Sequence, residues 1–503
     1  MVSYNFENVV ARLNLTAEEK EAILQDALTE EREHVVEQAL LLIEGVYVNL
    51  PLKRTRNAID PVQRLKLLRY RLPKMDEMSF QREMLSIFIG VRDLHTVYTP
   101  PSTFDLWFGL PFIIEEFYEK NKRQYLISHF NSEVENPSFK KGVTVTHWNG
   151  IPIDRAVELH AARTAGSNEF ASRARGLESM TNRSSSRVLI PDEEWVDIRY
   201  ITENNQKQEL RFNWEVEGLP PEDKPEASTV QSEGVGFRTA LGIDFETEGI
   251  QRIKKARYAP ASEEREENVE HDFVWTVRKT NHGEFGYIRI YNFMIDEIDK
   301  FIGDLIRVLE QIPENGLILD VRGNPGGYIM AGEMMLQLFT PNKIDPARFQ
   351  FINTPTTLKM APYPWQDSIR QSIETGAVYS QGFTITGYKS YIDQVNQHGQ
   401  KYKGPVLLIT DALCYSTTDM FAAGFQDHNI GPILGTSGNT GAGGANVWEY
   451  SYLQYSLDLT SLPRGASFRL AVRRSTRVGD RAGFPLEDFG VIPDYIHCMT
   501  KND

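Results

Sequence analysis

The sequence predicts a multidomain α/β protein whose largest part is a βα-layered core built on a mostly parallel sheet. Three observations lead to this fold class. The chain has 503 residues, more than one hydrophobic core usually serves, so several domains are expected. Its first hundred residues have the pattern of helices, and residues 110–211 that of short strands and turns. From residue 284 onward, predicted strands and helices alternate, which is typical of parallel βα units.

The first hundred residues carry the helical signals. Thr16 and Glu19 have the spacing of a capping box, and residues 35–48 show apolar side chains at helical spacing. A further helix is expected after the Asp-Pro pair at 60–61, and another over residues 80–91. These signals predict an N-terminal helical region over residues 1–100.

Residues 110–215 are expected to form a β-rich domain. Within it, the pair Asn149-Gly150 lies between two short apolar stretches and predicts a two-residue hairpin turn. Residues 216–283 begin with a stretch rich in Pro, Glu and Ser and contain an acidic run at 261–270. Such composition is typical of solvated loops, so this segment is expected to be linker.

The α/β core is expected over residues 284–503. Its expected strands are 285–291, 316–321, 405–410 and 432–435, and its expected helices are 296–310, 328–338 and 418–426. The carboxyl ends of parallel strands meet at one edge of a sheet, and sites lie in the loops beyond them. Two loops qualify here, 322–327 and 412–416.

The composition excludes some classes of function. The 54 basic and 69 acidic residues give a net charge of −15, which disfavours a nucleic-acid partner because phosphates would be repelled. No apolar run approaches the roughly 20 residues that span a bilayer, and no signal-peptide pattern opens the chain. The two cysteines fit a reducing compartment. The expectation is a cytoplasmic protein, or a secreted or periplasmic one if a signal was removed.

Ser416 is the first candidate for chemistry. It lies between a predicted buried strand and a predicted helix, so its hydroxyl would sit near the helix N-terminus. The helix dipole there favours developing negative charge, and the N–H of Thr417 would be an oxyanion donor. A serine in this place is, however, usually only a helix cap. Cys414 is a weaker candidate nucleophile, because a free cysteine is often simply buried.

The loop 322–327 reads Arg-Gly-Asn-Pro-Gly-Gly. Its glycines tolerate positive φ and allow backbone N–H groups to turn outward, where they would bind an anion or an oxyanion. A plain tight turn explains the same pattern equally well. A phosphate-binding loop is excluded, because no Gly-Lys-Ser/Thr follows.

A serine nucleophile needs a base. No lysine occurs between Lys403 and Lys501, so a lysine shortly downstream of Ser416 is excluded and histidine is the better base. Of the ten histidines, His428 ends the helix after Ser416 and would point away. His95 follows a predicted helix in the stretch Asp-Leu-His-Thr, but this pattern alone indicates only a loop histidine.

Taken together, these segments resemble peptidase family S41, the family of C-terminal processing proteases and tricorn protease. The family's Asp-x-His-Thr/Ser motif is similar to residues 93–96, and its strand followed by Arg-Gly/Asn-Asn-Pro-Gly-Gly to residues 320–327. The nucleophile segment of the family runs into Ala-Gly-x-Gln-Asp, matched by residues 423–427. A last match, Glu-x-x-Gly-Val-x-Pro, lies within residues 485–494.

At one position the sequence departs from the pattern of the processing proteases, and there it resembles another branch of the family. Processing proteases carry a catalytic lysine in a Thr-x-Gly-Lys-Gly stretch, whereas residues 439–444 read Asn-Thr-Gly-Ala-Gly-Gly, with Ala442 in the lysine's place. This is similar to the His-dependent branch, which includes tricorn protease and the chlamydial protease-like activity factor.

The resemblance implies a serine endopeptidase in which Ser416 attacks the peptide bond and His95 is the general base. It implies that Glu487 assists, although Asp488 beside it leaves the register of this third residue open. The implied oxyanion donors are the N–H groups of Gly326, Gly327 and Thr417.

The same resemblance implies a crotonase-like peptidase core, a PDZ-like domain at residues 110–215 and an N-terminal helical domain. It implies a peptide or protein substrate and neither a metal nor an organic cofactor. The sequence leaves open whether the N-terminal helices form a homodimer and whether an internal segment within 216–235 or 258–272 inhibits the enzyme.

Two other functions stay open at this point. A non-catalytic ligand-binding protein on the same fold would have no reason to keep Ser416, His95 and Glu487 together. An esterase or amidase would use the same residues, but the nucleophile elbow Gly-x-Ser-x-Gly of such hydrolases is absent around Ser416.

Overall fold

The computed structural model describes residues 16–101, 106–130, 134–184, 188, 190–218, 273–295 and 297–503, and the structural statements below refer to these residues. Most of the predicted linker lies outside the described residues, including 219–235 and 258–272 of the two stretches considered as inhibitory segments.

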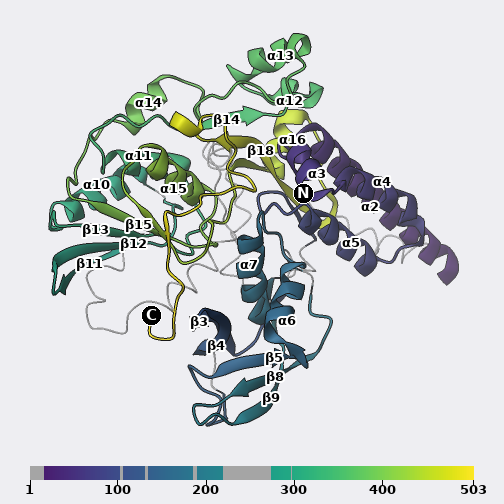
Figure 1. The fold of residues 1–503 in the computed structure, drawn as a ribbon. Coiled ribbons are helices and arrows are strands. Elements are labelled where there is room, and N and C mark those ends of the chain that lie inside the picture. Colours follow the sequence, from purple (N-terminus) through teal and green to yellow (C-terminus); the bar gives the residue numbers. More distant parts are fainter. Residues whose placement is uncertain are drawn as a thin grey trace.

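The core is a six-stranded sheet in the order β11-β12-β13-β15-β16-β19 (Figure 1). From β12 onward neighbouring strands are parallel, and only β11 runs antiparallel to its neighbour β12. The predicted mostly parallel sheet is therefore confirmed. The strands are β11 (Phe273–Thr280), β12 (Gly283–Ile290), β13 (Leu317–Asp320), β15 (Val406–Thr410), β16 (Ile433–Gly435) and β19 (Tyr495–Ile496).

The core begins earlier in the chain than predicted. The expected boundary was residue 284, but β11 pairs with β12 over its whole length and belongs to the sheet from Phe273 on. Its side chains are mostly half-buried or exposed, as on an edge strand, so its composition hardly differs from that of the loop before it.

Three helices pack over this sheet. Figure 1 shows α10 (Ile298–Leu309), α11 (Ile329–Gln337) and α15 (Thr417–Asp427) on the same side of it. Helix α11 packs against both α10 and α15. All three helices were predicted to within two residues at each end, except that the predicted start at Asp296 lies outside the described residues.

A second, smaller sheet flanks the core. Strand β18 lies at its centre and pairs antiparallel with β1, β14 and β17. The strands are β1 (Val97–Thr99), β14 (Arg348–Phe351), β17 (Ala445–Glu449) and β18 (Ser467–Thr476). The remaining elements of this part are α12 (Pro355–Met360), α13 (Trp365–Thr375), α14 (Ser390–Val395), α16 (Tyr450–Leu457) and the 3₁₀ turns η4 (Pro463–Gly465) and η5 (Gly479–Arg481).

The N-terminal region is helical and shares one hydrophobic core with residues 273–503. Its elements are α2 (Ala17–Gly45), α3 (Leu50–Asn57), α4 (Pro61–Arg71), the 3₁₀ turn η1 (Leu72–Lys74) and α5 (Glu77–Gly90). The two predicted helices at 16–19 and 35–48 are one helix, α2, which ends at Gly45. The sequence did not predict α3, because this short helix has proline as its second residue, carries three basic residues and has only two buried side chains.

The β-rich region at 110–215 has a separate hydrophobic core. Its main sheet has the order β3-β4-β5-β8-β9, with β6 paired to β5, and a smaller sheet has the order β10-β2-β7. The predicted turn joins β5 to β6, with φ of 48° at Asn149 and 76° at Gly150. The elements are β2 (Leu106–Gly109), β3 (Phe112–Glu119), β4 (Lys122–Phe130), β5 (Thr144–Trp148), β6 (Ile151–Pro152), α6 (Ile153–Ala161), α7 (Glu169–Thr181), β7 (Asn182–Ser184), β8 (Trp195–Ile201), β9 (Lys207–Asn213) and β10 (Glu215–Gly218).

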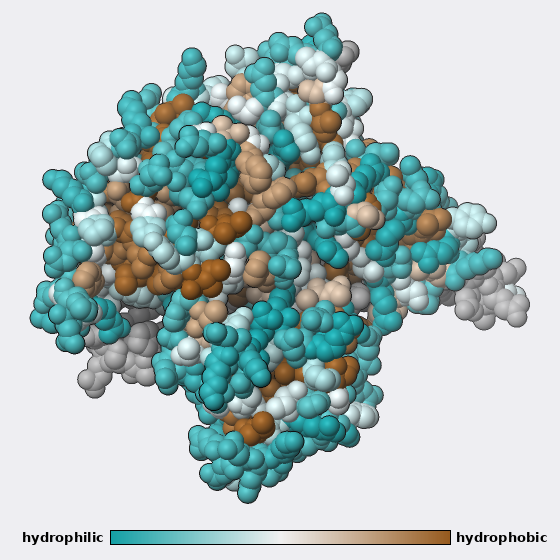
Figure 2. All heavy atoms as spheres, in the orientation of Figure 1, coloured by the Kyte–Doolittle hydropathy of each residue, from teal (hydrophilic) through white to brown (hydrophobic). Residues whose placement is uncertain are grey.

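One face of the molecule shows how hydrophilic and hydrophobic side chains are distributed. Figure 2 shows hydrophilic side chains over most of the face in view, with hydrophobic areas confined to smaller patches. Among the described helices, none is by itself long and apolar enough to cross a membrane. Only Leu28–Gly45 taken together with Leu50–Asn57 reaches the required length and composition, and this pair is bent by 87°.

A buried carboxyl group in α11 makes the stability of this packing depend on pH. Glu333 accepts hydrogen bonds from the Tyr391 hydroxyl (2.6 Å) and the Ala347 N–H (2.8 Å). Burial raises the pKa of Glu333 from 4.5 to about 7. A carboxyl whose pKa is higher in the folded chain stabilises the fold below its unfolded-state pKa and loses that contribution as pH rises.

We therefore expect Glu333→Gln to gain stability relative to the wild type between pH 4.5 and pH 7. The gain is about 3 kcal/mol, because each unit of pKa corresponds to about 1.4 kcal/mol. Urea unfolding of both proteins across this pH range measures it. A difference between the two unfolding free energies that stays constant with pH would contradict the assignment.

Candidate active site

The two loops predicted to carry the site meet at one edge of the core sheet. Strands β13 and β15 are parallel neighbours, so their following loops leave the sheet side by side. Asn324 joins the loops: its carbonyl accepts the Tyr415 N–H (3.0 Å), and its side-chain oxygen accepts the Thr418 hydroxyl (2.7 Å). The Asn-Pro-Gly-Gly turn is thus fixed against the segment that carries Ser416.

Ser416 occupies the N-cap position of α15, but its side chain makes no capping hydrogen bond. Its backbone has φ 58° and ψ −122°, a conformation that non-glycine residues rarely adopt. Strain of this kind is held by the surrounding structure and is typical of functional sites. The helix-cap interpretation therefore does not describe this serine.

Backbone N–H groups lie around Ser416, but not all of the predicted oxyanion donors are equivalent. The Gly326 N–H already donates to the Asn324 side chain (2.9 Å). The Thr417 hydroxyl donates to the Gly327 carbonyl (2.6 Å). Within the described residues, no hydrogen bond is found from the N–H of Gly327 or of Thr417. Of the three predicted oxyanion donors, the Gly326 N–H is therefore already used by a hydrogen bond within the turn. The N–H groups of Gly327 and Thr417 are still able to donate to an oxyanion.

His95 lies in the short loop after α5 and packs against the nucleophile segment. Its ring contacts that of Tyr415, the residue before Ser416, in a tilted arrangement with 4.5 Å between ring centroids and 31° between planes. The Asp93 Oδ1 lies 3.9 Å from the His95 Nδ1 and also accepts the His95 N–H (2.8 Å). Residues more than 300 positions apart in the sequence therefore meet here.

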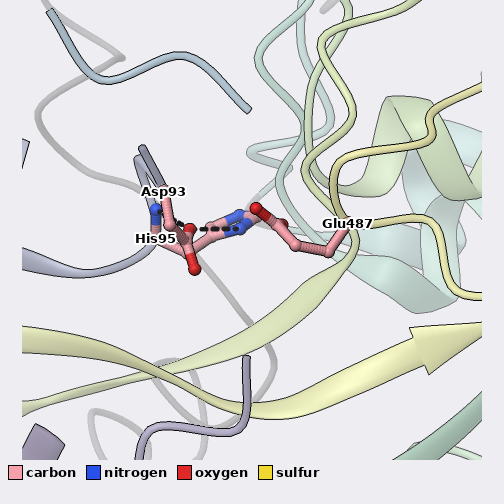
Figure 3. Close-up of side chains that lie close together, drawn as sticks. All are labelled: Asp93, His95 and Glu487. Atoms are coloured by element: carbon pink, nitrogen blue, oxygen red, sulfur yellow. Dashed lines mark hydrogen bonds and ion pairs between the residues drawn. The ribbon is translucent and has the colours of Figure 1, made fainter. Parts of the chain in front are cut away.

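A second carboxylate flanks the same imidazole. One side-chain atom each of Asp93, His95 and Glu487 lie within 4.8 Å of one another. Figure 3 shows the His95 ring extending towards the Glu487 carboxyl group, with Asp93 beside it. The neighbouring Asp488 instead faces Arg56, 3.9 Å away. The geometry thus favours Glu487 over Asp488 as the acid next to His95.

The Asp93 carboxylate is held by several donors. It accepts the Tyr47 hydroxyl (2.8 Å) and the Asn49 amide (3.2 Å) in addition to the His95 N–H. Burial alone would raise the pKa of Asp93, but the charge of Lys53, that of His95 and these hydrogen bonds together lower it. The carboxylate is therefore ionised and close to the imidazole.

The hydrogen bonds accepted by Asp93 and Glu487 also affect whether this cluster can bind a metal ion. A histidine and two carboxylates within 4.8 Å are a set that metal ions use. Here both Asp93 oxygens accept hydrogen bonds, and the Glu487 Oε1 accepts Lys53 (2.6 Å) and Ser167 (3.0 Å). Because most of the lone pairs are engaged, the cluster suits ion pairing and proton transfer better than metal ligation.

Lys53 is the main residue that the sequence reading missed. It projects from α3 and donates to the Glu487 Oε1 and to the Arg92 carbonyl (2.9 Å), and it also pairs with Asp488. The side chains of Lys53, Glu487 and Asp488 are completely buried. The sequence indicates such a residue only through the adjacent acids Glu487 and Asp488, because two buried acids need a cation beside them.

The loop that lacks a lysine lies beside these acids. Ala442 is buried, and its carbonyl accepts the Asp488 N–H (3.1 Å). The Asp419 carboxylate holds the loop to α15 by accepting the N–H groups of Ala442 (3.2 Å) and Gly443 (2.9 Å).

Cys414, the weaker candidate nucleophile, is buried, and this burial raises the pKa of its thiol well above the ordinary value. Because the thiolate is the reactive form of cysteine, the protonated Cys414 is unreactive.

The β-rich region also reaches the site. The Ser167 hydroxyl donates to Glu487, and the Asn168 amide donates to the Thr440 carbonyl (2.9 Å). The Arg175 guanidinium lies over the Tyr415 ring, 5.2 Å from its centroid. These contacts cover the cluster, and Ser416 is only 4 %, His95 2 % and Glu487 0 % exposed.

Known proteins resemble the chain in sequence profile and in fold. The sequence profile of peptidase family S41 matches residues 284–496. No curated protein sequence matches the chain. Among solved structures, mature CPAF complexed with lactacystin has a TM-score of 0.65 at 14% identity and covers 95% of each chain. The crystal structure of mature CPAF alone has the same TM-score and identity, over 95% of this chain and 94% of that chain.

The photosystem II D1 C-terminal processing protease has a TM-score of 0.40 at 12% identity over 93% of both chains. The likeness to CPAF is one of fold, and the family profile covers the strands, the glycine-rich turn and the helix that surround Ser416. Residues 284–496 therefore match peptidase family S41, and the protein is a serine peptidase.

Proposed function

We propose that the chain cleaves peptide bonds within polypeptides through Ser416, with His95 as general base and Glu487 assisting. The observation that carries this proposal is the close ring contact of His95 with Tyr415, the residue next to a serine held in a strained conformation without a capping role. Strain at a residue with no structural use of its side chain is expected of a nucleophile.

The proposed reaction follows from the positions of these groups. The Ser416 oxygen attacks the peptide carbonyl carbon as His95 takes the hydroxyl proton, and the acyl-enzyme forms when His95 returns that proton to the leaving amine. Water then attacks the ester in the same way. Asp93 and Glu487 flank the imidazole and stabilise the imidazolium that exists between the two proton transfers.

The oxyanion would be held at the start of α15. The N–H groups of Gly327 and Thr417 are the donors that carry no hydrogen bond within the described residues. The positive end of the α15 dipole lies at the same place. Donors fixed before the reaction stabilise the developing charge at no cost in reorganisation, which is usually a large part of catalysis.

Replacing Ser416 by alanine is expected to lower casein cleavage at least about 1,000-fold, because the nucleophile and its proton are both lost. The fold should remain, since the serine hydroxyl makes no capping bond. Cleavage rates and thermal unfolding of the two proteins measure both effects. Ser451→Ala, an exposed serine in α16, is the matched control and should cleave at the wild-type rate. A folded Ser416→Ala protein that cleaves casein like the wild type would refute the proposal.

Gly326 provides a test of the geometry around the nucleophile. A Cβ at this position, where φ is 99°, would lie 2.6 Å from the Ser416 Cβ and 2.7 Å from the Thr417 nitrogen. We expect Gly326→Ala to lower kcat/KM at least about 100-fold, because the nucleophile and an oxyanion donor must move.

The control for this variant is Gly323→Ala in the same turn. Gly323 also has a positive φ, 69°, but an added Cβ there meets nothing within 4 Å. It should cost about 1–2 kcal/mol of stability and leave kcat/KM near the wild-type value. Equal losses of activity in the two variants would mean that backbone strain, and not collision with Ser416, is responsible.

A further inference from the structure

Lys53 is a completely buried lysine at the centre of the charged cluster. Its ammonium group donates to the Glu487 Oε1 (2.6 Å) and to the Arg92 carbonyl (2.9 Å) and pairs with Asp488. A buried charge is costly unless partners surround it, and these three contacts match the three N–H bonds of an ammonium group. The position of Lys53 is therefore tightly determined.

Lys53 contacts groups on both sides of the His95 imidazole. Arg92 directly precedes Asp93 in the loop that carries His95, and Glu487 lies on the other side of the ring. A lysine that only fastened α3 to the rest of the fold would need Asp488 alone. Instead, one cation joins the loop of the proposed base to the acid that assists it.

The two oxygens of Glu487 have different surroundings. Its Oε1 accepts Lys53 and Ser167, whereas the buried Oε2 has no hydrogen-bond partner within the described residues. With Oε1 fixed by two donors, the rotation of the carboxyl group is set. Oε2 is left as the atom that can face the imidazole.

The charges around Glu487 are mostly negative. Burial and then the charge of Asp93 raise the pKa of Glu487 well above its ordinary value, while Lys53 is the cation that lowers it. The pKa of Lys53 is itself raised, because its pairing with Glu487 and Asp488 outweighs the effect of burial. The charged and titratable groups near this cluster are Lys53, Asp93, His95, Asp488, Arg56, Tyr47, Tyr415 and, beyond Tyr415, Arg175.

We propose that Lys53 is a positioning residue of the catalytic site, which holds the Glu487 carboxyl group towards His95 and opposes its protonation. This inference rests on the proposed function and deepens it, because it makes α3 of the N-terminal region part of the catalytic unit. Lys53 itself touches neither the nucleophile nor the substrate. Its removal should therefore change kcat and the pH dependence more than KM.

The test is the pH profile of casein cleavage by Lys53→Met, which keeps most of the length of the side chain and removes the charge. Without the cation, Glu487 takes up a proton at higher pH, so the acid limb of kcat/KM should move upward by at least about one pH unit. Activity at pH 7 should fall at least about 10-fold and partly recover at pH 9, with KM nearly unchanged.

Two further variants separate this role from a structural one. Arg54→Met removes an exposed cation of the same helix, which pairs with Asp60 at 2.9 Å, and should leave the profile unchanged. Lys53→Met combined with Asp488→Asn removes a cation and an anion together. It should recover thermal stability relative to Lys53→Met while keeping the shifted acid limb.

The inference is overturned if folded Lys53→Met has the wild-type profile. It is also overturned if the variant loses activity equally at every pH and the double variant restores it, because the lysine would then serve only the fold. Neither result bears on the proposed function, which the Ser416→Ala variant tests separately.

Discussion

Three carboxylates and one ammonium group lie together out of water where the N-terminal helices, the core loops and the β-rich region meet. Charges at such depth cost several kcal/mol each unless their partners are in place. Segments far apart in the chain must therefore arrive together: α3 with Lys53, the loop after α5 with Asp93, and the C-terminal loop with Glu487. This requirement explains why the N-terminal helices share a hydrophobic core with residues 273–503 and do not form a separate body.

A second constraint holds the segment that carries Ser416 beside this cluster. Parallel pairing of β13 and β15 brings their loops to one edge, and Asn324 then joins the loops through its carbonyl and its side chain. The glycine-rich turn lies close to Ser416, whose positive φ is held by the surrounding structure. Tyr415 connects the two parts, since its ring contacts His95 while its backbone is held by Asn324.

Much of this could be predicted from local patterns. The alternation of strands and helices, the Asn149-Gly150 turn and the place of Ser416 before α15 all follow from hydrophobic period and turn chemistry, which depend on neighbouring residues. The roles of His95 and Glu487 rested on resemblance of motifs and stay predictions, although the fold brings both side chains to within 4.8 Å of Asp93.

What escaped prediction depends on contacts between distant segments. Lys53 and Glu487 are 434 positions apart, and α3 has neither an apolar stripe nor a helix-favouring start beyond its proline. The Gly326 N–H donates to the Asn324 side chain because of the path that the backbone takes through the turn. The spacing of glycines in the sequence does not determine that path. Strand β11 was missed because an edge strand buries little and reads like a loop.

The central claim is that Ser416 is a nucleophile activated by His95, and one measurement addresses it most directly. The protein is treated with a fluorophosphonate, which reacts with activated serines, and the site of the adduct is located by tandem mass spectrometry. The account predicts a single phosphonylated residue, Ser416, and no adduct in a folded His95→Ala variant. An adduct on another residue, or labelling of Ser416 that is equally fast without His95, would contradict it.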